Sequence, residues 1–210
     1  MKKSLFLLFA LLAVVLTVGT AFRFAPAEGG YQVGDKVADF KLKNVDGKLV
    51  SLSGNAAAKG YIVVFTCNTC PYAKAYEDRV MALNQKYAAQ GYPVLAINPN
   101  DPQVAPGDSY ADMQKRAKDK QYAFPYLLDE TQDVARSFGA TRTPHVYVLQ
   151  RAGQDFKVAY IGAIDNNTED AKAATQRYVE DAMTQLLAGQ AVQTSSTKAI
   201  GCTIKWKKKA

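Results

Sequence analysis

The chain has 210 residues, of which 48% are hydrophobic, and this is enough apolar material for one sizeable core rather than two. Its formal charge is +7, but the excess lies near the two ends, so the nearly balanced body predicts no nucleic-acid partner. Three cysteines are too few, and odd in number, for a secreted disulfide scaffold.

Residues 1–27 are typical of a secretory export signal, with Lys2 and Lys3 followed by an almost wholly apolar run over 5–18. Cleavage is predicted after Ala21 or Ala27. The apolar run is close to the lower length limit for a membrane span, so retention as an N-terminal anchor is the alternative, and the only membrane contact expected from this end. Both readings place the folded part outside the cytoplasm, which in a bacterium is the periplasm.

The next segment predicts a linker followed by a hairpin. Residues 28–38 are rich in glycine and polar side chains, and we expect the folded domain to occupy 34–188. Two strand-like runs, 40–42 and 49–52, flank Asp46-Gly47, which is a hairpin signal. The continuous apolar run at 61–66 is typical of a strand buried on both faces of a sheet.

A long helix is predicted from Pro71 to Gly91, because apolar residues recur at helical spacing, proline suits the first turn and glycine suits the end. Residues 93–97 predict a second buried strand, parallel to the first. Ser109 predicts the cap of a helix that runs to about 120. A short apolar run at 125–128 and a helix over 131–138 follow.

The final part of the chain predicts two further strands and a helix. Thr143-Pro144-His145 introduces a strand at 146–149, which turns at Ala152-Gly153 into a strand at 156–161. A last helix is expected over 168–187, with Asn167 or Thr168 as its cap. Residues 189–210 form a basic C-terminal tail. The alternation predicts an α/β fold with a mixed central sheet, helices on both faces and an N-terminal β-hairpin.

The residues with the clearest chemical signal are Cys67 and Cys70, spaced C-x-x-C between a buried strand and a helix start. A helix N-terminus stabilises the thiolate, which is the reactive form of cysteine. We expect an exposed Cys67 to attack and Cys70, in the first helical turn, to resolve the mixed disulfide. The alternatives are a structural disulfide or half of a zinc site, although the sequence lacks a second such pair to complete one.

Three further side chains are candidates for a supporting role. Arg142 precedes Pro144 by two residues and would stabilise the Cys67 thiolate if this turn faces the cysteines; the alternative is a solvated arginine. His145, the single histidine, is either structural or a proton carrier or copper ligand beside the two thiols. Glu77 is either a proton acceptor for Cys70 or a solvated residue near a helix start.

Cys202 lies in the tail, far from the other two cysteines. It is a candidate second resolving cysteine, an intermolecular partner or an inert thiol. Ile200, Ile204 and Trp206 surround it, and leaving these side chains in water is costly, so we expect the tail to dock on the body of the domain.

Several blocks of this sequence resemble the thioredoxin superfamily and, within it, the peroxiredoxin-like (AhpC/TSA, redoxin) branch. These blocks, which together span about 34–206, are Cys67-Asn68-Thr69-Cys70-Pro71-Tyr72 with Glu77-Asp78-Arg79, Ala96-Ile97-Asn98 with Asn100-Asp101, Phe124 to Thr131, Gly139-Ala140 with Thr143-Pro144, and Gly201 to Trp206. The resemblance implies a thioredoxin fold, an exposed first cysteine and a cis Pro144 beside it. It implies no bound cofactor or metal.

The sequence departs from this resemblance at informative positions. Thr69 and Arg142 stand where the subgroup commonly has His and often has Cys. The P-x-x-x-T-x-x-C motif of true peroxiredoxins, aligned on Cys70, meets Val63 and Cys67 instead. We therefore expect a thiol–disulfide oxidoreductase acting on protein or small-molecule thiols and disulfides, through Cys67, Cys70, Thr143, Pro144 and Arg142. A thiol-dependent peroxidase and a Sco-like copper chaperone that uses His145 are the alternatives.

Overall fold

This computed structural model describes residues 29–208, and the core of the fold is a mixed sheet of eight strands. The predicted export signal, residues 1–27, lies outside the described residues. The strand order is β1-β9-β8-β4-β5-β6-β2-β3. The strands are β1 (Lys36–Val37), β2 (Lys41–Asn44), β3 (Leu49–Ser51), β4 (Gly60–Phe65), β5 (Val94–Asn98), β6 (Tyr126–Leu128), β8 (His145–Ala152) and β9 (Asp155–Gly162).

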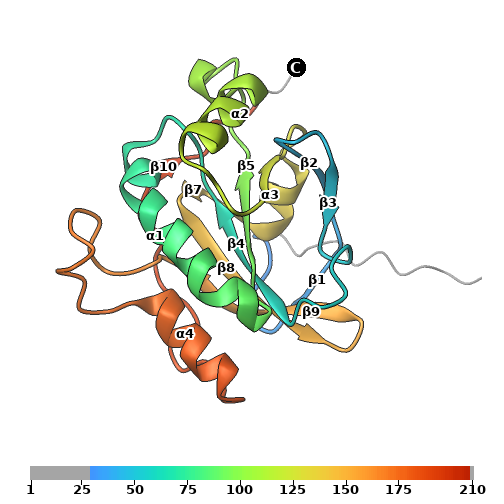
Figure 1. Cartoon of the computed structure of the whole chain (residues 1–210), viewed down its shortest axis with the longest axis vertical. Coiled ribbons are helices and arrows are strands. Elements are labelled where there is room, and N and C mark those ends of the chain that lie inside the picture. The colour runs from blue at the N-terminus through green and yellow to red at the C-terminus, as the bar shows by residue number, and fades with distance from the viewer. Residues whose placement is uncertain (1–28, 209–210) are drawn as a thin grey trace, which may run out of the picture.

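Four α-helices are described: α1 (Pro71–Tyr87), α2 (Tyr110–Asp119), α3 (Asp133–Phe138) and α4 (Tyr178–Leu187). Short 3-10 turns cover Ala88–Gln90 and Pro106–Asp108. A separate two-stranded sheet pairs β7 (Arg142–Thr143) with β10 (Cys202–Thr203). This small sheet pairs Cys202 with Thr143 and Thr203 with Arg142, and Figure 1 shows it beside the start of α1.

The centre of the sheet is β4, whose six residues are all buried. Its neighbours are β5, which is parallel, and β8, which is antiparallel. Branched and aromatic side chains suit a strand covered on both faces, and β4 consists almost entirely of them after Gly60. The predicted buried strands at 61–66 and 93–97, and their parallel pairing, are confirmed.

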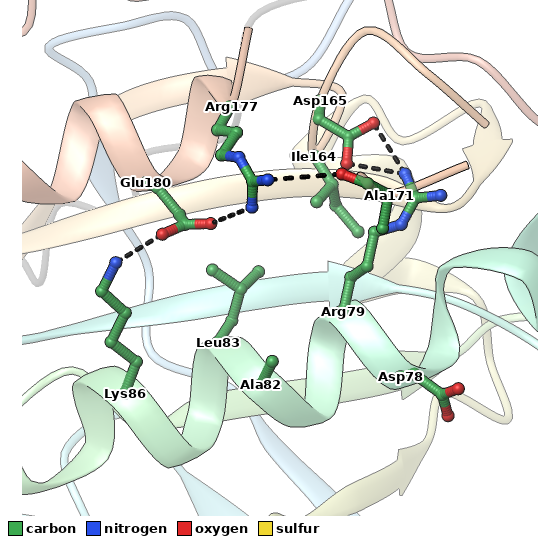
Figure 2. A pocket seen from close by; sticks show the side chains of 10 residues that line it. All are labelled: Asp78, Arg79, Ala82, Leu83, Lys86, Ile164, Asp165, Ala171, Arg177 and Glu180. Atoms are coloured by element: carbon green, nitrogen blue, oxygen red, sulfur yellow. Dashed lines mark hydrogen bonds and ion pairs between the residues drawn. The ribbon is translucent and has the colours of Figure 1, made fainter. Parts of the chain in front are cut away.

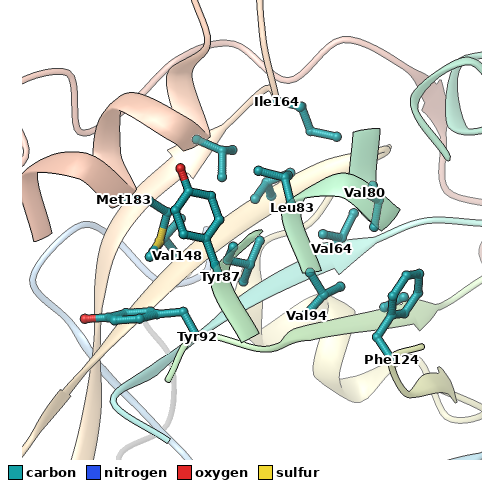
Figure 3. Close-up of a cluster of buried hydrophobic side chains, with 14 of the residues drawn as sticks. Val64, Val80, Leu83, Tyr87, Tyr92, Val94, Phe124, Val148, Ile164 and Met183 are labelled. Carbon is teal, nitrogen blue, oxygen red and sulfur yellow. The ribbon is translucent and has the colours of Figure 1, made fainter. Parts of the chain in front are cut away.

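The two faces of the sheet hold two separate hydrophobic clusters. On one face α1 and α4 pack against the sheet, as Figure 1 shows, and the cluster includes Val64, Leu83, Val148 and Met183 (Figure 3). On the other face the cluster includes side chains of α3. The predicted α/β architecture with a mixed sheet, helices on both faces and the β2–β3 hairpin is therefore confirmed.

Local signals placed most elements correctly. The long helix begins at Pro71, and Gly91 follows it in the left-handed region with φ of 94°. Ser109 caps α2, because its hydroxyl oxygen accepts from the Asp112 backbone N–H at 3.2 Å. Gly139 ends α3 with φ of 70°.

Two predictions along the chain are wrong. Residues 28–38 are not a plain linker: they contain β1, and Tyr31 is buried with its ring edge-on to Phe138. The last helix begins at Tyr178 rather than at 168. The preceding loop instead wraps around Arg79, whose guanidinium binds Asp165 at 2.6 Å and the Thr168 carbonyl oxygen at 3.2 Å.

Within residues 29–208, no helix is both long enough and apolar enough to cross a membrane.

Candidate active site

The C-x-x-C segment connects the centre of the sheet to the start of α1. A residue that precedes proline is forced into extended geometry, and Cys70, which precedes Pro71, has φ of −71° and ψ of 125°. Cys70 is therefore the N-cap of α1, whereas the sequence analysis placed it in the first helical turn. Cys67 lies two residues after the end of β4. Both sulfurs are thus fixed between the most buried strand and a helix N-terminus.

The third cysteine of the chain joins this pair. Cys202, on β10, forms a disulfide with Cys70, and their Cα atoms are 5.9 Å apart. Cys67 is left as a free thiol, in the same small cluster as Cys70, Ala73 and Cys202. The expected docking of the tail is therefore confirmed, and the site contains three cysteines that lie together rather than two.

Thr143 is the residue around which the three cysteines are arranged. Its hydroxyl lies 3.3 Å from Cys67 Sγ, within hydrogen-bond distance, and its carbonyl oxygen lies 3.1 Å from Cys70 Sγ. Its backbone is paired with that of Cys202 in the β7–β10 ladder. The Thr143–Pro144 peptide bond is cis, as the family resemblance implied. Thr143 is fully buried, so its side chain has a fixed place beside the Cys67 thiol.

Cys67 is buried, with 4% of its surface exposed, so the expectation that the first cysteine would be exposed is wrong for this structure. Burial raises the pKa of the Cys67 thiol, and the nearby negative charge of Asp108 raises it further. Hydrogen bonds from Thr143 and from the backbone of Cys70 and Thr69 act in the opposite direction without cancelling these effects. The helix N-terminus alone therefore does not make this cysteine a low-pKa thiol.

Asp108 is a member of the site that the sequence did not reveal. Its carboxylate is fully buried and accepts hydrogen bonds from the Asn68 backbone N–H at 2.5 Å and from the Thr69 hydroxyl at 2.7 Å. The side-chain amides of Asn98 and Asn100 also donate to it, at 3.3 and 2.8 Å. Asp108 thus holds both residues between the cysteines. Only its place in the apparently irregular loop at 98–108 could have drawn attention to it.

The hydrogen bond that Arg142 forms is with the tail and not with Cys67. Its Nη1 donates to the Gly201 carbonyl oxygen at 3.3 Å, so the guanidinium binds the segment that carries Cys202. The side chain is partly buried rather than fully solvated. Arg142 therefore contributes to the docking of β10 on β7 in the structure, whereas we had expected it to act on the thiolate.

His145 follows the cis-proline but belongs to the other face of the sheet. It pairs with Phe65 in the β4–β8 ladder, and its ring lies 4.8 Å from that of Tyr147, on the side opposite α1. Burial lowers its pKa to about 4, and Nδ1 has no hydrogen-bond partner. Across residues 29–208, no three His, Cys, Asp or Glu side chains are grouped so as to hold a metal ion. The copper-binding alternative therefore lacks a ligand set here.

Glu77 is neither solvated nor free to accept a proton from Cys70. It is 7% exposed and is bound by Arg116 Nε at 2.7 Å, by Lys120 Nζ at 2.9 Å and by the Tyr122 hydroxyl. Burial alone would raise its pKa, but these partners outweigh burial and hold the pKa below its usual value. Its ion pairs join α1 to α2, which makes Glu77 a structural residue of the helix that begins at the site.

Concave surfaces flank α1, and two of them are lined mainly by charged residues. One lies beside the start of the helix, where Asn68, Thr69 and Gly107 meet charged side chains of α1 and α2, namely Lys74, Asp112, Lys115, Arg116, Asp119 and Lys120. The other lies between α1 and α4 and is lined by charged residues that pair with one another, as Figure 2 shows for Arg79 with Asp165 and for Lys86 with Glu180. No cysteine lines the second surface. No cysteine lines the first surface either, but its lining includes Asn68 and Thr69, the two residues between the cysteines.

The chain is similar to several known proteins. The sequence profile of the AhpC/TSA family matches residues 33–161. The thiol-disulfide oxidoreductase ResA of Geobacillus thermodenitrificans is 24% identical over 129 residues, which cover 60% of this chain and 68% of ResA.

Among solved structures, an uncharacterized conserved protein from Geobacillus kaustophilus is 35% identical and has a TM-score of 0.78, with 85% of this chain and 94% of that chain covered. The exposed lipoprotein thioredoxin Etrx1 from Streptococcus pneumoniae is 22% identical, has a TM-score of 0.53 and is covered over 99% of its length by 72% of this chain. The fold is therefore that of the thioredoxins.

Proposed function

Because the chain belongs to the AhpC/TSA family and has the thioredoxin fold, we propose that it is a thiol–disulfide oxidoreductase with Cys67 as nucleophile and Cys70 as resolving residue. One observation carries this proposal: the Cys67 thiol, the Cys70 sulfur and the cis Thr143–Pro144 bond meet at a helix start. The similarity to ResA, a thiol-disulfide oxidoreductase, supports the same class of reaction.

The proposed reaction has two exchange steps. The Cys67 thiolate attacks one sulfur of a substrate disulfide, so that a mixed disulfide forms and the other substrate sulfur leaves as a thiolate. The Cys70 thiolate then attacks Cys67 Sγ, which releases the second substrate sulfur and forms a Cys67–Cys70 disulfide. The substrate gains the two electrons that the protein loses. Cys70 takes part only when it is not bound to Cys202.

Thr143 has a positioning role in this scheme. Its hydroxyl, 3.3 Å from Cys67 Sγ, stabilises the thiolate by hydrogen bonding and so works against the burial that raises the thiol pKa. Pro144 fixes the backbone that presents Thr143 to both sulfurs. We expect substrate to approach along the groove lined by Asn68, Thr69 and Lys74.

A peroxidase function has less support. The raised pKa of Cys67 lowers the thiolate fraction for disulfide exchange and for peroxide attack alike, so the choice between them depends on the sequence motif. Val63 and Cys67 occupy the positions at which true peroxiredoxins carry the proline and the threonine of their motif. We therefore propose disulfide exchange rather than peroxide reduction.

We place the protein outside the cytoplasm, on the strength of the signal-like sequence at 1–27. Thiol–disulfide exchange in that compartment acts on exported proteins, because disulfides form and persist there. The substrates that we propose are accordingly protein or small-molecule thiols and disulfides of the cell envelope.

The test is a thiol-exchange assay with the reduced protein and a cysteine-containing peptide disulfide. Cys67→Ser should abolish exchange, whereas Cys70→Ser should accumulate a mixed disulfide at Cys67 that mass spectrometry detects. Thr203→Ala, an exposed neighbour of Cys202 on β10, is the matched control and should exchange like the unaltered protein. Unchanged exchange in Cys67→Ser would rule out the mechanism.

A further inference from the structure

The structure assigns Cys202 as a third redox-active cysteine, which replaces Cys67 as the disulfide partner of Cys70. This inference rests on the proposed function and deepens it. In the exchange, the Cys202 thiolate attacks Cys70 Sγ within a Cys67–Cys70 disulfide. The Cys67–Cys70 bond breaks, the Cys70–Cys202 bond forms, and Cys67 leaves as a thiolate. One thiolate replaces another, so the step needs no external oxidant or reductant.

The first argument is the identity of the bonded sulfur. The disulfide of the structure uses Cys70, which is half of the C-x-x-C pair, and leaves Cys67 free in the same cluster. A disulfide that served only as a staple for the tail would occupy a reactive sulfur without need. Because Cys70 Sγ is common to both disulfides, the two bonds are alternatives at one atom.

The second argument is that β10 is held at the site by contacts independent of the disulfide. The Ile204 backbone N–H donates to the Thr141 carbonyl oxygen at 3.2 Å, and Ile204 itself is buried. The Lys205 carbonyl oxygen accepts from the Asp101 backbone N–H at 2.8 Å, and the Lys205 N–H donates to Asn100 Oδ1 at 2.9 Å. Cys202 is therefore kept beside Cys70 after the bond opens, at a high effective concentration.

The third argument is the close fit of Gly201 against the cis-proline turn. A Cβ atom at this position would lie 2.2 Å from the Thr143 carbonyl oxygen and 3.0 Å from the Pro144 nitrogen. Both are backbone atoms that cannot move aside as a flexible side chain would. Any side chain at 201 would thus lift the neighbouring Cys202 away from Thr143, while all three cysteines remain in the chain.

This fit supplies the decisive variant. The fully reduced protein is pulsed with one equivalent of a small-molecule disulfide as oxidant, quenched with acid at intervals and mapped by mass spectrometry. The Cys67–Cys70 disulfide should form first and then convert to Cys70–Cys202, at a first-order rate that does not depend on protein concentration. Gly201→Ala should slow this conversion by about tenfold or more, because the effective concentration of Cys202 at Cys70 falls. Ile200→Ala, at an exposed neighbour, should convert at the original rate.

Two results would overturn the inference. One is a Cys70–Cys202 disulfide that forms directly, with no Cys67–Cys70 precursor; the other is equal conversion rates in Gly201→Ala and the unaltered protein. The time course of the unaltered protein is informative even if a variant fails to fold. A mixed disulfide trapped at Cys67 in Cys70→Ser would preserve the proposed function in either case, so the two failures are distinguishable.

Discussion

The Cys70–Cys202 disulfide should be the largest single covalent contribution to the stability of this domain. The cysteine pair encloses 132 positions of the chain. In the chain-entropy treatment, closing a loop of that length in the unfolded state raises the unfolding free energy by about 5 kcal/mol. Because engineered and natural disulfides often contribute less than this limit, we expect a loss of about 3–5 kcal/mol when the bond is removed.

The cleanest perturbation is Cys202→Ser in a Cys67→Ser background. The parent variant can form only the Cys70–Cys202 bond, and the double variant can form none. Guanidinium unfolding is followed by far-UV circular dichroism, which reports the whole domain. It is followed in parallel by the fluorescence of Trp206, the single tryptophan, which packs over Arg136 in the docked tail.

The parent should unfold in one transition by both probes. In the double variant the fluorescence change should come at a lower denaturant concentration than the loss of ellipticity, because the tail is then held by hydrogen bonds and packing alone. The parent treated with a dithiol reductant should reproduce the curves of the double variant. Unfolding free energies that agree within about 1 kcal/mol, with coincident probes in both variants, would refute the reasoning.

Three further predictions concern buried ionisable groups. Glu77→Gln should lower the unfolding free energy by about 3 kcal/mol at neutral pH, because Arg116 and Lys120 lose the buried carboxylate that they bind. The unaltered protein should lose stability as pH falls below the ordinary glutamate pKa of 4.5, and this loss should be smaller in the variant. The pKa of His145 is lowered from 6.5 to about 4, so stability should fall by about 3 kcal/mol as pH decreases across that interval and should not in His145→Leu; NMR titration of this single histidine checks the pKa. Asp108→Asn should lower the pKa of Cys67, because a negative charge that raises it is removed, and the rate of Cys67 alkylation at neutral pH should increase. An unchanged alkylation profile would contradict this last expectation.

The parts of the fold that the sequence predicted correctly depend on signals within a few residues. The apolar run that becomes β4, the proline and glycine that bound the α1 region and the Asp46-Gly47 turn each act locally. For the same reason the cysteine pair could be placed between a strand and a helix. The docking of the tail was also predictable, because isolated apolar side chains such as Ile204 need a surface to cover them.

The features that were missed depend on partners far away in the chain. Asp108 accepts a hydrogen bond from Asn68, which lies 40 positions earlier in the chain, and the local sequence does not indicate that this carboxylate is buried. The loop before α4 wraps around Arg79, whose partner Asp165 lies 86 positions away in the chain. The local helix signals at 168 therefore led to a wrong prediction of where the last helix begins. The burial of Cys67 could not be predicted either, because it is a property of the assembled site, in which β10 places Cys202 against the C-x-x-C pair.

The separation of the disulfide partners also sets an order of events during synthesis. At about 5–20 residues per second, Cys202 emerges on the order of ten seconds after Cys70. Until then Cys67 is the only intramolecular partner within reach of Cys70. A newly made chain that meets an oxidant early would therefore close the short disulfide first, and would acquire the long one only when its last strand arrives at β7. The Cys70–Cys202 disulfide therefore shows that the last strand has reached β7, whereas the Cys67–Cys70 disulfide forms both in a new chain and in each proposed turnover.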